Sequence, residues 1–326
     1  LAFIEAVVEA AEGTGVIPYT TITSLTETGK ATVAAEMKQD GKVWSELIKD
    51  KVTGVGYIQG NGKFEATSNI GEGVSAYSRA SDATVDLTKE EMAKYYNMAQ
   101  TEMNLKEILD NVFFIVIPSE NADGRTVFTR TNDNYFDLNR DNTYQTQSET
   151  KAITQLIAKW NPVSFHEIHG FYEQFQVEPC SPTHEPHAEY DLFMDTALRQ
   201  GENFGSTAIA NNEKINSFQM PMRDYLSIDK DGKKNWTPFD DMSTSYTPQY
   251  SFLHGTNGFT VEVPYGSEEA VQAVKYGFIG NAVFVTENKD RMFTNQLEFY
   301  RRGIENIDAD TVRPWYVSQS DEIGAE

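Results

Sequence analysis

Hydrophobic and polar positions change their spacing several times along the chain, and each change marks an expected element. Over residues 1–11 apolar side chains recur at the spacing of a helix, and a glycine follows soon after to end it. Between 18 and 85 short stretches rich in Thr, Val, Tyr and Ile alternate with Gly, Asn and Asp, which is typical of β-hairpins. The pattern therefore predicts an N-terminal helix and then a β-rich insertion, with a short helix near 43–49.

Two helices are predicted by capping boxes, in which a threonine is followed three residues later by a glutamate. Thr88 opens the first, and a stripe of Met, Tyr, Ala and Ile that suits core packing continues it to about residue 108. Thr146 opens the second, which runs to about Trp160. Between them the run at 111–117, NVFFIVI, is uninterrupted and rich in branched side chains, so it predicts a strand buried on both faces.

Apolar runs and helical segments continue to alternate in the second half of the chain. This alternation predicts an α/β fold with a mixed central β-sheet flanked by helices. The aromatic region at 211–250 predicts a long connection, and connections of this length are usually functional. We expect one domain over 1–306, with the β-rich insertion at 18–85, and a charged tail or the start of a linker at 307–326. The remaining expected elements are strands at 163–168 and 258–264 and helices at 188–203, 268–287 and 291–306.

Acidic residues dominate the charge of the chain. There are 49 Asp and Glu against 27 Lys and Arg, a net charge of −22. Phosphate repulsion then argues against nucleic acid or an anionic membrane as a partner, and no apolar run is long enough for a transmembrane helix. A single cysteine, Cys180, excludes an internal disulfide. This composition suits a secreted or cell-surface protein of a bacterium, although a cytoplasmic protein would have similar features.

Histidines are the first candidates for chemistry, since four of the five lie between positions 166 and 187 and imidazole is the commonest metal ligand. His166 and His169 are three residues apart, so at the end of a strand they face opposite sides and are poor joint ligands. Glu167 and His169 share a side, where the carboxylate can orient the imidazole. His169 is thus the candidate metal ligand, and a structural or surface role stays open as the alternative.

Three arginines stand out in the polar stretch after the 111–117 run, because the chain has few basic residues. They are Arg125, Arg130 and Arg140, and Asn139 precedes the last of them. A guanidinium group is a planar fork that binds a carboxylate through two hydrogen bonds. The stretch is therefore a candidate for gripping an anionic substrate end, with salt bridges to the many Asp and Glu residues as the alternative.

Glu262 is the third candidate, since it stands inside the apolar run at 258–264. A carboxylate in such a position is costly unless it is paired. It suits a general base, and a hydrogen-bonded core glutamate is the alternative that the sequence leaves open.

The order of these motifs resembles the zinc carboxypeptidase family. Along the chain come NADGR at 121–125, DLNRD at 137–141, SETKA at 148–152, a strand that ends at His169 and a strand that carries Glu262. The resemblance covers about residues 105–300 and implies the family's α/β architecture, of the phosphorylase/hydrolase type. It also implies a hydrolase that releases C-terminal residues from peptides with a free C-terminus.

The resemblance implies a role for the residues of each motif. Asn139 and Arg140 would bind the terminal carboxylate of the substrate. His169 would be the third ligand of one Zn²⁺ ion, with Glu167 in the place of an aspartate. Glu262 would be the general base that activates the zinc-bound water, whose pKa the metal lowers towards neutrality.

Two further roles are implied less definitely. Arg130, with Arg125 as the second choice, would polarise the scissile carbonyl. Tyr246 or Tyr250 would cap the substrate, and their spacing does not decide between them.

Two departures from the family's pattern bear on function. The His-x-x-Glu motif that supplies the first two zinc ligands is absent from the sequence, so both ligands are expected upstream of Leu1. Asp141 stands where the family has an asparagine after the Asn-Arg pair, which bears on contacts to the substrate end. The alternatives are a relative that cleaves another amide, such as a cell-wall peptide, and a metal-free peptide-binding homologue without catalysis.

Overall fold

The computed structural model of the chain supports a description of its central and C-terminal parts. The expected helices at 1–11 and 43–49 and most of the 18–85 insertion lie outside the described residues, as do Cys180, His184 and His187. The described residues are 15–28, 38–39, 42–43, 93–94, 96–170, 175–179, 189–215, 218, 224–228, 234–238, 243–264 and 267–307.

A three-stranded sheet with the order β5-β9-β6 lies at the centre. β5 (Ser164–Ile168) runs parallel to β9 (Asn257–Glu262), and β6 (Gln176–Pro179) runs antiparallel to it. Phe259 and Val261 in β9 are fully buried, as expected for an apolar strand with a neighbour on each side. The strands predicted at 163–168 and 258–264 are thus confirmed, and the sheet is mixed, as predicted.

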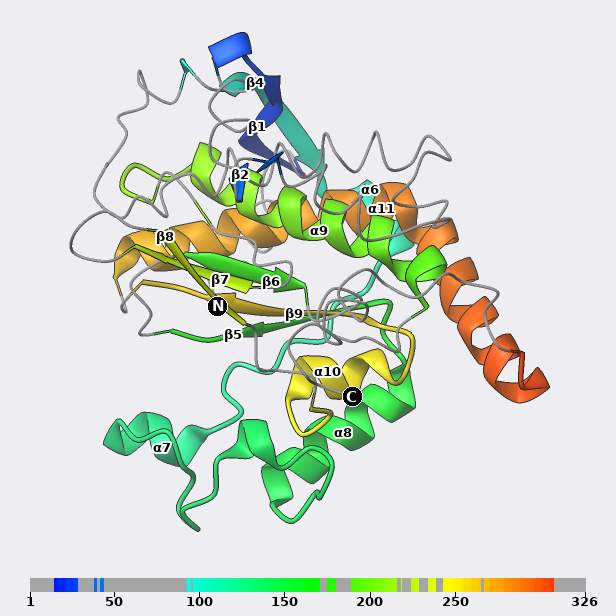
Figure 1. Ribbon diagram of the computed structural model, residues 1–326. Coiled ribbons are helices and arrows are strands. Elements are labelled where there is room, and N and C mark those ends of the chain that lie inside the picture. Colours follow the sequence, from blue (N-terminus) through cyan, green and yellow to red (C-terminus); the bar gives the residue numbers. More distant parts are fainter. Residues whose placement is uncertain are drawn as a thin grey trace.

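Helices lie on both sides of this sheet, which gives the α/β arrangement expected from the sequence (Figure 1). α9 (Tyr190–Ala210) and α11 (Glu268–Glu305) pack together on one side. α8 (Ser148–Trp160) and the short α10 (Thr247–Phe252) lie on the other. The helices predicted to end near Trp160 and to span 188–203 are confirmed, although α9 continues further than expected.

α11 continues without a break for 38 residues, where the sequence predicted two helices. The prediction of a break between 287 and 291 is wrong, because the polar segment there contains neither glycine nor proline. Asn288 instead donates its side-chain amide to the carbonyl oxygen of Phe284 within the helix. α11 packs closely against α9 at Gly277, where an added Cβ would lie 2.3 Å from the ring of Phe204.

β1 (Val16–Leu25) and β4 (Tyr96–Asn104) form a separate antiparallel pair. The sequence predicted a helix over β4, and that prediction is wrong. The backbone of β4 pairs with the much earlier strand β1, with Gln100 opposite Thr20, and local spacing does not indicate such a pairing. A helix, α6 (Leu105–Asn111), begins only after Asn104, whose side chain accepts a hydrogen bond from the amide of Glu107.

Two further strand pairs are short and antiparallel. β2 (Lys38–Gln39) pairs with β3 (Lys42–Val43) within the predicted β-rich insertion. β7 (Asp224–Ile228) pairs with β8 (Lys234–Pro238). The region at 211–250, predicted as a long connection, therefore contains regular structure.

The apolar run after α6 differs most from expectation. Residues 112–117 are not assigned to a strand, and Phe113 is 66% and Val116 46% exposed, so the prediction of a doubly buried strand is wrong. The composition suits burial, but none of the described strands pairs with this run. Within the described part of the chain no helix is long and apolar enough to cross a membrane.

Candidate functional site

The polar loop after the apolar run is folded back by Asn121. This residue caps α7 (Ala122–Val127) by accepting a hydrogen bond from the amide of Gly124 (2.9 Å), and its Nδ2 donates to the carbonyl oxygen of Arg130 (3.0 Å). Position 124 must be small, since an added Cβ would lie 2.3 Å from Asn121 Nδ2. The NADGR motif therefore fixes the backbone at Arg130, whose Nε pairs with Asp137 Oδ2 at 2.6 Å.

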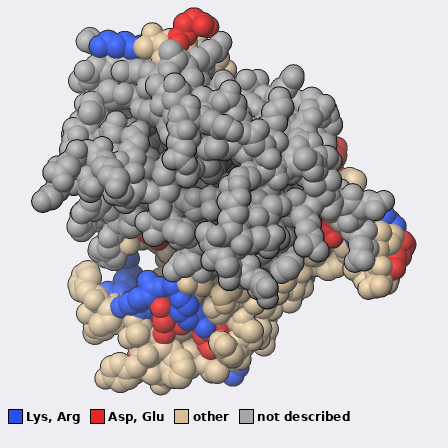
Figure 2. Space-filling view, viewed as in Figure 1, with Lys and Arg blue, Asp and Glu red and all other residues tan. Residues whose placement is uncertain are grey.

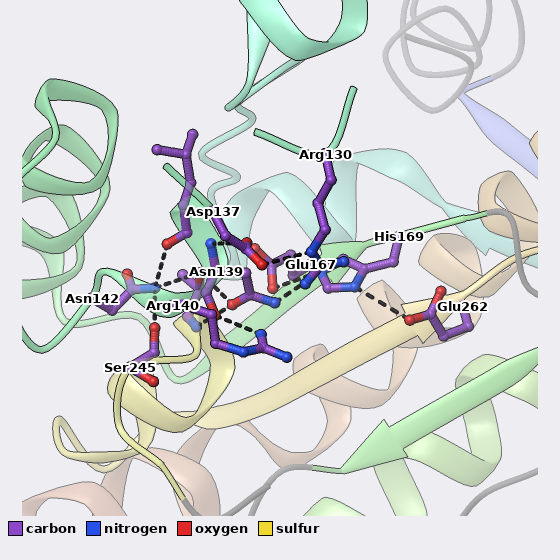
Figure 3. A network of polar contacts seen from close by, with 11 residues as sticks. Arg130, Asp137, Asn139, Arg140, Asn142, Glu167, His169, Ser245 and Glu262 are labelled. Atoms are coloured by element: carbon purple, nitrogen blue, oxygen red, sulfur yellow. Dashed lines mark hydrogen bonds and ion pairs between the residues drawn. The ribbon is translucent and has the colours of Figure 1, made fainter. Parts of the chain in front are cut away.

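Asn139 lies in a single turn of 3-10 helix, η2 (Leu138–Arg140), that begins where Asp137 accepts a hydrogen bond from its amide. Its side-chain oxygen accepts hydrogen bonds from the amide (2.8 Å) and the hydroxyl (3.2 Å) of Thr247. Its Nδ2 lies 3.4 Å from Nε2 of His169 (Figure 3). Asn139 thus contacts both α10 and the end of β5.

Arg140 is exposed and rests on an aromatic ring. Its guanidinium carbon lies 3.6 Å from the ring centre of Tyr246, and its Nη1 donates to the carbonyl oxygen of Asn139 (2.8 Å). Such a cation–π contact holds the guanidinium plane in a defined direction. No described carboxylate pairs with Arg140, in contrast to Arg130.

Asp141 is buried and serves the start of α8. Its carboxylate accepts hydrogen bonds from the amide and hydroxyl of Thr146 and from the amide of Gln147. Burial acts to raise the pKa of Asp141, but these hydrogen bonds outweigh it and lower the pKa below its usual value. Gln147, rather than Thr146, is the N-cap of α8, so the predicted capping box does not form. In this structure the carboxylate of Asp141 is engaged within its own loop.

His169 continues β5, where its amide donates to the carbonyl oxygen of Val261 (2.8 Å). Its Nε2 lies 2.8 Å from Glu167 Oε2 and its Nδ1 lies 3.3 Å from Glu262 Oε1. Burial acts to lower the pKa of His169, but the carboxylates of Glu167 and Glu262 outweigh it and raise the pKa to about 10. The shared side of Glu167 and His169 was predicted from strand alternation, and it is confirmed.

His166 points to the opposite side of β5, also as predicted. Its ring stacks on Phe259 and Phe204, with ring centres 4.5 Å and 5.0 Å away, and its Nε2 is buried. Burial lowers the pKa of His166 to about 3, so this ring is neutral and belongs to the core.

Glu120 was not predicted as a site residue, yet it lies in the same group of titratable side chains as Glu167 and His169. Burial, and after it the neighbouring carboxylate of Glu167, raises the pKa of Glu120 to about 8. The sequence feature that could have indicated Glu120 is its position between the apolar run and the NADGR motif, which it directly precedes. Thr247 was also missed, because its contact with Asn139 joins residues 108 positions apart.

The structure brings some predicted residues together and leaves others outside. Figure 3 shows Arg130, Asn139, Arg140, His169 and Glu262 in one polar network. Tyr246 joins it through the contact of its ring with Arg140. Two predicted residues take no part in it. Arg125 is exposed in the last turn of α7, and the hydroxyl of Tyr250 accepts a hydrogen bond from Gln145 (3.4 Å).

Basic side chains gather on the lower part of the molecule, where Figure 1 places α7 (Figure 2).

The donor set around His169 does not make a zinc site by itself. Among the residues that the structure describes, no three His, Cys, Asp or Glu side chains are arranged to hold a metal ion. Zinc takes at least three protein ligands, whereas this corner offers one imidazole whose two nitrogens face carboxylates. The predicted Zn²⁺ ion, and His169 as its ligand, stay predictions.

Comparison with known proteins gives one distant likeness. No protein-family model matches the chain, and no curated protein matches it. Among solved structures, a metallo-carboxypeptidase from Burkholderia cenocepacia is similar, with 17% sequence identity and a TM-score of 0.41. The match covers 68% of this chain and 55% of that one, so the chain spans little more than half of that protein's length. A likeness this distant assigns neither family nor activity.

Proposed function

We propose that the chain carries the substrate-binding and proton-transfer residues of a carboxypeptidase-like hydrolase acting on peptides with a free C-terminus. One observation supports this most directly. Asn139 Nδ2 lies 3.4 Å from His169, and His169 lies 3.3 Å from Glu262. Donors for an anion and a carboxylate able to take a proton therefore adjoin the same imidazole.

The terminal carboxylate of the peptide is bound by Arg140 and Asn139 in this proposal. Arg140 is exposed, is held over Tyr246, and has no carboxylate partner among the described residues. A guanidinium fork and an amide NH₂ group together supply the donors that a carboxylate accepts. Because the whole chain carries a charge of −22, attraction of an anion depends on local basic groups such as these.

Glu262 is the general base. Its carboxylate takes a proton from the attacking water and returns it to the leaving amine, so that the peptide bond breaks with no net change in the residue. Arg130 is the candidate for polarising the scissile carbonyl, with its Nε already paired to Asp137. The resemblance assigns His169 to a zinc ion whose other ligands the described residues do not supply, so these steps use the chain's own groups alone.

A metal-free peptide-binding protein is the second candidate, and one observation favours it. In this structure both ring nitrogens of His169 are engaged by carboxylates, Nε2 by Glu167 at 2.8 Å and Nδ1 by Glu262 at 3.3 Å, so neither nitrogen is directed at an open metal position. Such a protein would keep the grip on the peptide end and lack turnover.

The two candidates separate in one experiment on the full-length protein as its gene encodes it. N-acetylated dipeptides with several C-terminal residues are offered as free acids and as C-terminal amides, and both binding and hydrolysis are measured with and without a chelator. Hydrolysis of the acids that a chelator abolishes supports the hydrolase. Acid-selective binding without hydrolysis supports the binding protein. Equal binding of acids and amides overturns both.

A further inference from the structure

We infer that Thr247 is a positioning residue that sets which end of the Asn139 amide faces the substrate, and thereby the preference for a peptide acid over a peptide amide. The inference rests on the proposed function and deepens it. It concerns the specificity of the carboxylate grip, by which we mean Asn139 and Arg140 as donors to the terminal carboxylate of the peptide. It assigns Thr247 no contact with the substrate.

The side chain of asparagine is nearly symmetric in shape, and only its partners decide which end is oxygen and which is nitrogen. At Asn139 the partner decides clearly. The backbone amide of Thr247 can only donate, and it lies 2.8 Å from the Oδ1 position of Asn139. The oxygen must therefore face Thr247, and the NH₂ group faces the corner at His169.

The hydroxyl of Thr247 adds a second donor whose direction is also fixed. Asn142 donates its Nδ2 to this hydroxyl (3.0 Å) and to the carbonyl oxygen of Ser245 (2.9 Å). Because the hydroxyl oxygen already accepts from Asn142, its proton is free to point at Asn139 Oδ1, 3.2 Å away. Asn142 and Thr247 are both fully buried, so water does not compete for these bonds.

The orientation of the Asn139 amide matters because a carboxylate only accepts hydrogen bonds. With the NH₂ group turned outwards, Asn139 donates to a peptide acid. With the amide flipped, its oxygen would face the carboxylate and repel it, while a peptide amide could donate to that oxygen. Thr247 therefore selects for the acid by making the flipped state leave two buried donors unpaired.

The position of α10 is set by its contact with β9. An added Cβ at Gly258 would lie 2.5 Å from the carbonyl oxygen of Pro248, so the glycine allows α10 to lie against the strand that carries Glu262. Tyr246, the residue before Thr247, supplies the ring beneath Arg140. Two consecutive residues thus orient the two donors of the carboxylate grip.

Three variants remove the donors in steps. Thr247→Ser keeps both the amide and the hydroxyl, Thr247→Val removes the hydroxyl, and Thr247→Pro removes both. Proline suits this position because Thr247 is the first residue of α10 and the preceding residue, Tyr246, is extended, with φ −82° and ψ 142°. The melting temperature of each variant shows whether it folds, and Thr247→Val alone decides the test if Thr247→Pro does not.

The measurement is the ratio of Kd for a C-terminal amide to Kd for the matching acid, with N-acetylated dipeptides and the full-length protein. We expect the ratio to stay unchanged in Thr247→Ser, to fall about threefold in Thr247→Val and about tenfold in Thr247→Pro, with Kd for the amide not weakened. A structural role alone would weaken acid and amide equally. A wild-type ratio in folded Thr247→Val and Thr247→Pro overturns the inference and leaves the proposed function intact.

Failure of the proposed function has a different signature, namely that the wild-type protein itself does not distinguish acid from amide. The side-chain NH₂ signals of Asn139 in an NMR spectrum then decide the inference by themselves. One sharp pair in wild type and Thr247→Ser, with doubled or broadened signals in Thr247→Val, supports positioning by Thr247. One sharp pair in all the folded variants overturns it.

Discussion

Asn139 Nδ2 and His169 Nε2 lie 3.4 Å apart although 30 positions separate the two residues in the chain. The contact joins a turn of the polar loop to the end of a central strand. It places Asn139, a proposed donor to the peptide carboxylate, beside His169 and its neighbours Glu167 and Glu262. In the proposed exopeptidase the peptide end and the bond to be cleaved lie within one residue of each other, and this contact is consistent with that proximity.

Replacement of Glu262 by Gln tests the general base. Gln cannot take up the proton of water, so we expect peptide hydrolysis by the full-length protein to fall by about 10²–10⁴-fold. Zinc content, measured by elemental analysis, and acid-selective binding are expected to stay at wild-type levels. Glu269→Gln, which removes a carboxylate paired with Lys214 at the start of α11, serves as the control with full activity. Loss of zinc in Glu262→Gln would instead indicate a role in metal binding.

Arg140→Lys tests the grip on the peptide end. Lysine keeps the charge but lacks the planar fork and stacks less well on Tyr246, so Kd for an N-acetylated dipeptide acid is expected to rise about tenfold, with Kd for the amide unchanged. Arg125→Lys is the matched control, because Arg125 belongs to the same loop region and is exposed outside the network. An equal loss in both variants would show that only the summed charge of the loop matters.

His166→Phe tests whether the buried, neutral ring of His166 makes the free energy of unfolding depend on pH. The pKa of His166 is about 3 in the folded protein and near 6.5 in the unfolded chain, so the unfolded chain binds the extra proton between these values. Stability contributed by the neutral ring is therefore complete above pH 6.5 and is lost as pH falls through 3, by at most about 5 kcal/mol. Phenylalanine keeps the stacking and does not titrate. Urea unfolding at several pH values should show a flatter acid limb in His166→Phe, and parallel limbs would contradict the assignment.

Two glycines of α11 provide a matched pair for packing against α9. An added Cβ at Gly277 would lie 2.3 Å from the Phe204 ring, whereas one at Gly303 would have no atom within 4 Å. We expect Gly277→Ala to lower the free energy of unfolding by about 1–3 kcal/mol, and Gly303→Ala to raise it by about 0.5–1 kcal/mol through better helix propensity. Both are measured by urea unfolding. A neutral Gly277→Ala would mean that Phe204 moves aside without cost.

Local patterns in the sequence predicted the fold wherever an element depends mainly on its own residues. The apolar run around Phe259 forms a strand and the amphipathic segment before Trp160 forms a helix, since each buries one pattern of side chains. The prediction for β4 was wrong because its spacing of Met and Tyr fits a helix, and only its pairing with β1 makes it a strand. The run at 112–117 failed for the opposite reason, since its composition suits a strand that no described neighbour completes.

The residues of the candidate site also differ in whether local sequence or distant contacts reveal them. Arg140, His169 and Glu262 were predicted from their side-chain chemistry and from the order of motifs along the chain. Thr247 and Glu120 were not, because each acts through a contact with a residue far away in sequence. The role of Asp141 was likewise readable only from its hydrogen bonds to Thr146 and Gln147. The division of the chain at residues 306 and 307 and its secreted location stay predictions.

The exposed apolar run at 112–117 has a consequence for the behaviour of this chain in solution. Such a run, which carries no charge, has several exposed apolar side chains and pairs with none of the described strands, favours association between copies. What opposes association is the mutual repulsion of chains that each carry a charge of −22. That repulsion reaches about 10 Å at 0.1 M salt and about 3 Å at 1 M, so the chain should stay dispersed in dilute buffer and form aggregates as salt is added.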